Sequence, residues 1–129
     1  MKRVSRPLRQ DEKVLLAFLL SADFPGCDVL RMQAESTTVV GECECGCGTI
    51  GLEVGPGLPT AGLVKPHPLE AYGEMIIDVL LFVRNGFLGS LEVVFYEDSA
   101  ERPYPLPAQL QLGKRPQHGR GDVSSGRES

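Results

Sequence analysis

The sequence predicts an α+β fold in which two N-terminal helices pack on one face of a four-stranded antiparallel sheet made of two hairpins. Three observations carry this prediction. Apolar residues recur at helical spacing in the first 35 residues, and they alternate with polar residues at the strand period over 37–54. Between two further apolar runs stands Asn85-Gly86, a strong signal for a two-residue hairpin turn.

The N-terminal third is predicted to hold both helices. Residues 1–9 form a flexible lead, and residues 10–20 form the first helix. Asp11 and Glu12 lie in its first turn, where the helix dipole favours negative charge, and we expect both to face water. A second helix is predicted over 25–35. The apolar positions at helical spacing in the first helix are Val14, Leu15, Phe18 and Leu19.

The first hairpin is predicted over 37–54, around the sequence Cys43-Glu44-Cys45-Gly46-Cys47-Gly48. Successive side chains of a strand point to opposite faces. Strict alternation then turns Cys43 and Cys45 inward together with Val39, and turns Glu42 and Glu44 toward water. In this interpretation the sulfur atoms serve as packing beneath the helices.

The rest of the chain is predicted to add one hairpin to a single domain of residues 10–112. Residues 55–73 are rich in proline and glycine and are expected to form a long loop. The second hairpin, over 75–83 and 87–96, is expected at the centre of the sheet because its first run is apolar on both faces. Residues 113–129 have the composition of a disordered tail.

Composition excludes two classes of partner. A net charge of −4 argues against nucleic-acid binding, which needs a basic surface. No apolar run approaches the roughly 20 residues that span a bilayer. The acidic pair Asp11 and Glu12 directly before the apolar run 14–20 argues against an export signal. We therefore expect a cytoplasmic protein whose four cysteines are thiols.

The cysteines pose the main chemical question. A structural zinc site usually takes four Cys or His ligands, often from C-x2-C pairs, whereas Cys43, Cys45 and Cys47 have C-x-C-x-C spacing. They reach one ion only if the backbone bends at Gly46, and a fourth ligand then comes from Cys27, His67 or His118. Zinc is thus one alternative and thiol packing the other. No other cofactor is predicted.

The function favoured by the sequence is a non-enzymatic protein-binding module, for example an immunity-type protein that neutralises a basic partner. The predicted binding surface is an acidic sheet face, and its carboxylates are Glu42, Glu44, Glu53 and Glu92. Zinc binding is the second hypothesis, and a thiol-dependent enzyme is the third. A redox role is favoured least, because C-x-C lacks the helix-start geometry of C-x-x-C. The oligomeric state stays open.

Three segments together resemble a group of small actinobacterial proteins of uncharacterised function that share a CxCGC hairpin. The matching segments are 19–26, with Asp23-Phe24-Pro25-Gly26, the cysteine hairpin 39–52 and the second hairpin 80–96. The resemblance implies a free-standing bacterial protein, and it implies no activity, ligand or catalytic residue. Members of the group often carry proline where Gly48 stands here.

Overall fold

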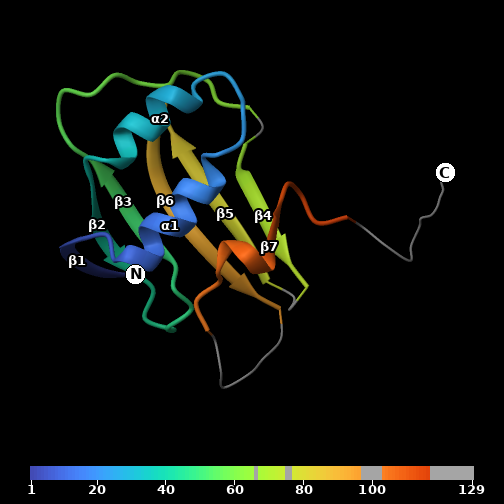
Figure 1. Cartoon of the computed structure of the whole chain (residues 1–129). Helices are drawn as coiled ribbons and strands as arrows, with labels where there is room; N and C mark the ends of the chain where they lie inside the picture. The colour runs from blue at the N-terminus through green and yellow to red at the C-terminus, as the bar shows by residue number, and fades with distance from the viewer. Residues whose placement is uncertain (66, 75–76, 97–102, 117–129) are drawn as a thin grey trace.

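The computed structural model describes residues 1–65, 67–74, 77–96 and 103–116. Within them the chain forms two α-helices, one short 3-10 helix and a seven-stranded sheet (Figure 1). Most of the predicted tail, 117–129, lies outside the described residues. The elements, in chain order, are β1 (Lys2–Pro7), α1 (Gln10–Leu19), α2 (Cys27–Ala34), β2 (Thr37–Glu42), β3 (Ile50–Val54), β4 (Leu69–Gly73), β5 (Ile77–Arg84), β6 (Phe87–Phe95), η1 (Pro107–Gln109) and β7 (Leu110–Leu112).

The sheet confirms the α+β class but has seven strands rather than four. Its order is β1-β2-β3-β6-β5-β4-β7, with antiparallel pairing throughout. Both predicted hairpins are present, and they join through the pairing of β3 with β6. The turn between β5 and β6 has positive φ at Asn85 (56°) and Gly86 (81°), as a two-residue hairpin turn requires.

The three additional strands come from the predicted flexible lead, from the predicted loop and from residues 110–112, for which no strand was predicted. β1 pairs with β2 along one edge of the first hairpin. β4 lies inside the predicted loop 55–73 and pairs with β5. Its Leu69 and Ala71 are buried. β7 in turn pairs with β4. Each short strand satisfies backbone groups that would otherwise stand unpaired at a sheet edge.

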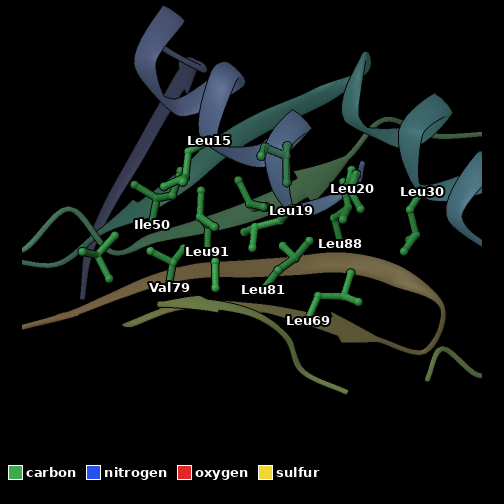
Figure 2. Close-up of a cluster of buried hydrophobic side chains, with 14 of the residues drawn as sticks. Leu15, Leu19, Leu20, Leu30, Ile50, Leu69, Val79, Leu81, Leu88 and Leu91 are labelled. Carbon is green, nitrogen blue, oxygen red and sulfur yellow. The ribbon is translucent and has the colours of Figure 1, made fainter. Parts of the chain in front are cut away.

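The core lies between the helices and the sheet, and Figure 2 shows its aliphatic side chains converging from both layers. Leu15 of α1, Leu81 of β5 and Leu91 of β6 are each 0% exposed. Leu15, Leu19 and Val39, which the sequence turns toward the core, are buried, but Phe18 and Cys43 are only partly so. On α1 the buried face is rotated relative to the prediction. Val14 is exposed, and the neighbouring apolar residues Leu16 and Leu20 are buried instead.

Two charged residues were placed wrongly from the sequence. Glu12 was expected to face water, but it is 0% exposed. The guanidinium of Arg6, on β1, donates to both Glu12 carboxylate oxygens at 2.9 Å, which lets that carboxylate be buried while charged. Arg115 belongs to the predicted tail, yet it donates to Asp78 on β5 at 3.0 Å. Its guanidinium also lies over the rings of Tyr72 and Tyr96.

Candidate metal centre

A register shift in β2 decides which side chains of the first hairpin face the helices. Val39 lies opposite Leu52, but Gly41 lies opposite Gly51 and Glu42 opposite Ile50, so β2 holds one extra residue at this point. Residues directly opposite one another in a sheet share a face. Glu42 therefore shares the helix-covered face with Ile50, which is 1% exposed.

The bulge overturns the alternation predicted from the sequence. Glu42, expected to face water, points toward α1, and its carboxylate accepts a 2.6 Å hydrogen bond from Arg6. Cys43 follows directly after the end of β2, and its N–H is bonded to the Thr49 carbonyl at 3.0 Å. Its side chain is half-buried and does not belong to the hydrophobic core.

A tight turn then gathers three sulfur atoms at the tip of the hairpin. The N–H of Gly46 bonds the Cys43 carbonyl at 3.4 Å, and Gly46 and Gly48 have φ of 82° and 97°, which favour glycine. The Sγ atoms of Cys43, Cys45 and Cys47 all lie within 4.8 Å of one another. Cys45 is exposed, and the other two are half-buried.

The base of the turn is fixed against β6 and against the C-terminal segment. The Thr49 hydroxyl accepts from the Val93 N–H at 3.0 Å, and the Cys47 thiol donates to the same hydroxyl at 3.3 Å. The ring of Tyr104 lies beside Gly48, where an added Cβ would come within 3.2 Å of it. Sequence reasoning assigned neither Thr49 nor Tyr104 to the hairpin tip, because both act through contacts distant in the chain.

Two of the sulfur atoms interact directly with each other. The Cys43 and Cys45 Sγ atoms are 2.8 Å apart. This hydrogen bond raises the pKa of the Cys43 thiol above its ordinary value, and proximity to Cys47 acts in the same direction. Neighbouring sulfurs resist carrying several negative charges at once. A cation bound among them would reverse that preference by stabilising the thiolates.

Of the three candidates for a fourth ligand, Cys27 and His67 lie elsewhere, and His118 is outside the described residues. Cys27 is buried at the start of α2, and its thiol lies 3.9 Å from the Asp28 carboxylate. His67 accepts from the Val83 N–H at 3.1 Å through Nε2, and its ring packs on Phe82. Across the described ranges, the metal-competent group of ligand atoms contains Cys43, Cys45 and Cys47, without Cys27 or His67.

The proposed acidic surface also changes. Glu44 and Glu53 are exposed and Glu92 is half-buried, whereas Glu42 is bonded to Arg6 on the helix side of the sheet.

Neither helix in the described part of the chain is long and apolar enough to cross a membrane. Comparison with known proteins finds no matching family model, no matching curated protein and no matching solved structure.

Proposed function

We propose that this protein binds one thiophilic metal ion, with Zn²⁺ as the expected ion, at the tip of the β2–β3 hairpin. Cys43, Cys45 and Cys47 supply three thiolate ligands. The supporting observation is the approach of their three Sγ atoms to within 4.8 Å of one another. Thiolate sulfur is a preferred ligand of zinc, and three protein ligands are enough to hold the ion when a fourth position is taken by another group.

The distances suit such an ion after a small adjustment. Zinc–sulfur bonds of about 2.3 Å in a tetrahedral site place the sulfurs about 3.8 Å apart. Cys43 and Cys45, now 2.8 Å apart, would separate by about 1 Å, a change within reach of side-chain rotation. Thr49 restrains the Cys47 thiol, so we expect the Cys43 and Cys45 side chains to make the adjustment that metal binding needs.

Packing explains this arrangement less well than ligation. A thiol that serves as a small hydrophobic side chain belongs in the core, as Cys27 does with 5% of its surface exposed. Cys45 is exposed, and Cys43 is half-buried and lies outside the hydrophobic core. The three thiols thus gain little from burial in their present positions, whereas a shared cation would offset their mutual repulsion.

Cobalt substitution under reducing, oxygen-free conditions tests this proposal. The full chain is titrated with Co²⁺ and then Zn²⁺, following thiolate-to-cobalt absorption and metal content after gel filtration. We expect one ion per chain and displacement of Co²⁺ by Zn²⁺. Cys45→Ser should lose the ion or bind it far more weakly, and Cys27→Ser is the matched control that should keep it.

Two results would count against metal binding at the hairpin. One is the absence of thiolate-to-cobalt absorption in the fully reduced, folded chain. The other is a signal that survives Cys45→Ser but disappears in Cys27→Ser, which would move the site to α2. Circular dichroism of each variant separates loss of metal from loss of fold.

Protein binding remains the second proposal, on a narrower surface than the sequence suggested. Glu44 at the hairpin tip and Glu53 on β3 are exposed carboxylates, and they would attract a basic partner. Glu44→Lys with Glu53→Lys should reduce capture of such a partner from a native lysate. Unchanged capture would remove this surface from consideration.

A further inference from the structure

The sulfur atoms at the hairpin tip have different hydrogen-bond partners. Cys43 and Cys45 approach to 2.8 Å, while Cys47 donates to the Thr49 hydroxyl at 3.3 Å. Thr49 is itself bonded to both the N–H and the carbonyl of Val93 on β6. Two thiols of the cluster therefore form a close pair, and the third is tied to the sheet.

The close pair lies within reach of a covalent bond. Bonded sulfurs stand about 2.05 Å apart, and the pair needs to approach by less than 1 Å. The chain curls between the two residues, because the Gly46 N–H bonds the Cys43 carbonyl and Gly46 has positive φ. Cys45 is exposed, so an oxidant in solution can reach its sulfur.

We propose that Cys43 and Cys45 are a dithiol pair that forms a reversible disulfide by exchange with a low-molecular-weight disulfide. The Cys45 thiolate attacks one sulfur of the oxidant, whose S–S bond breaks and releases one thiolate. The Cys43 thiolate then attacks the Cys45 sulfur of the mixed disulfide and releases the second thiolate. Both protein thiols are oxidised, the oxidant is reduced to two thiols, and these take up the two protons.

This pairing would control the metal centre, and that consequence rests on the proposed function. A disulfide between Cys43 and Cys45 removes two of the three thiolate ligands, because only thiolates hold the ion. Metal binding separates the two sulfurs, whereas oxidation brings them together. The two states are therefore mutually exclusive, and the reduced state alone holds metal.

The experiment measures the disulfide in metal-free protein, so that its outcome does not depend on metal binding. The reduced full chain is equilibrated with mixtures of reduced and oxidised glutathione, quenched with acid, alkylated and analysed by mass spectrometry. We expect the loss of two hydrogens and of two alkylatable thiols, with peptide mapping to Cys43 and Cys45. Dithiothreitol should restore four thiols.

Three variants assign the roles of the sulfurs. Cys47→Ser should form the disulfide as wild type does, although it should bind metal poorly. Cys43→Ser lacks the resolving thiol and should accumulate a glutathione adduct on Cys45. Thr49→Val removes the partner of Cys47 and should allow a mixture of pairings that includes Cys47.

In metal-loaded wild type, oxidation should be slower and should release one ion per disulfide.

The proposal is overturned if four thiols persist under oxidised glutathione, if the wild-type bond includes Cys47, or if wild type accumulates a stable glutathione adduct. Failure of the metal proposal looks different. In that case the Cys43–Cys45 disulfide forms and reverses, but reduced protein binds no cobalt or zinc.

Discussion

Two clusters at the β1–β2 end of the sheet show opposite ways of bringing reactive groups together. On the helix side, Arg6 bonds both Glu12 and Glu42, with distances of 2.6 to 2.9 Å. At the hairpin tip, the Sγ atoms of Cys43, Cys45 and Cys47 lie within 4.8 Å of one another. The first cluster pairs opposite charges within the fold, whereas the second brings like groups together, and we propose that a metal ion joins them.

The bulge in β2 lies just before the point where the chain passes from one cluster to the other. Glu42 and Cys43 are neighbours in the chain, and the extra residue in β2 places the Glu42 carboxylate on the helix-covered face, where Arg6 bonds it. Without the extra residue, Glu42 would lie on the opposite face of the sheet. The difference shows that the fold can satisfy a buried charge with a partner of its own, whereas the convergence of three thiols is the observation on which the metal proposal rests.

The largest expected effect comes from breaking the balanced cluster. Arg6→Ala leaves the Glu12 carboxylate, which is 0% exposed, without its bidentate partner. We expect a loss of about 3–5 kcal/mol in the free energy of unfolding, measured by urea denaturation. Asp28→Ala breaks a surface ion pair on α2 and should cost under about 1 kcal/mol. Equal losses in the two variants would show that Glu12 is solvated.

The second prediction concerns the pH dependence of metal binding. The hydrogen bond with Cys45 and the proximity of Cys47 raise the pKa of Cys43, so a bound ion must displace protons at neutral pH. Zinc affinity should rise with pH by about tenfold per pH unit for each proton displaced. Competition with a chelating dye from pH 6 to 9 measures this slope. A flat profile would argue against thiolate ligation.

A smaller effect is expected from the two turn glycines, which share positive φ but not their surroundings. Each change to alanine should cost about 1–2 kcal/mol for the left-handed backbone. Gly48→Ala should cost more than Gly46→Ala, because its Cβ would come within 3.2 Å of the Tyr104 ring, while Gly46 has no atom within 4 Å. Thermal unfolding ranks the two, and the reverse order would contradict the packing of Tyr104 on the turn.

The smallest effect near neutral pH is the titration of Glu12. Burial acts to raise its pKa, but hydrogen bonds from Arg6 and from the Arg9 N–H, with both positive charges, lower it overall. The stabilisation is complete above the unfolded-state pKa of about 4.3 and is lost as the pH falls through the lower folded-state value. Unfolding measured in acid should show this loss in wild type and a weaker loss in Glu12→Gln. Parallel curves would contradict it.

The sequence was most informative where local rules decide structure. Asn85 and Gly86 fixed the second hairpin, and alternation in 50–54 fixed β3. It was least informative where contacts distant in the chain decide. The pairing of β1 with β2 and the burial of Glu12 both depend on Arg6, whose partners are six and 36 residues away.

The candidate site was predicted in part. The C-x-C-x-C spacing predicted that Cys43, Cys45 and Cys47 could reach one ion only if the backbone bends at Gly46. The turn has that bend, and the three sulfur atoms lie close together. The expected contributions of Cys27 and His67 depended on chain folding that spacing cannot specify. The extra residue in β2 could not be predicted either, because the alternation of apolar and polar residues carries no information on strand register.

X-ray absorption at the zinc edge of the metal-loaded chain tests the convergence of the three thiols most directly. We predict three sulfur neighbours at about 2.3 Å, falling to two in Cys47→Ser if that variant retains the ion. A first shell of nitrogen and oxygen, or one containing a single sulfur, would contradict a metal centre built from the hairpin.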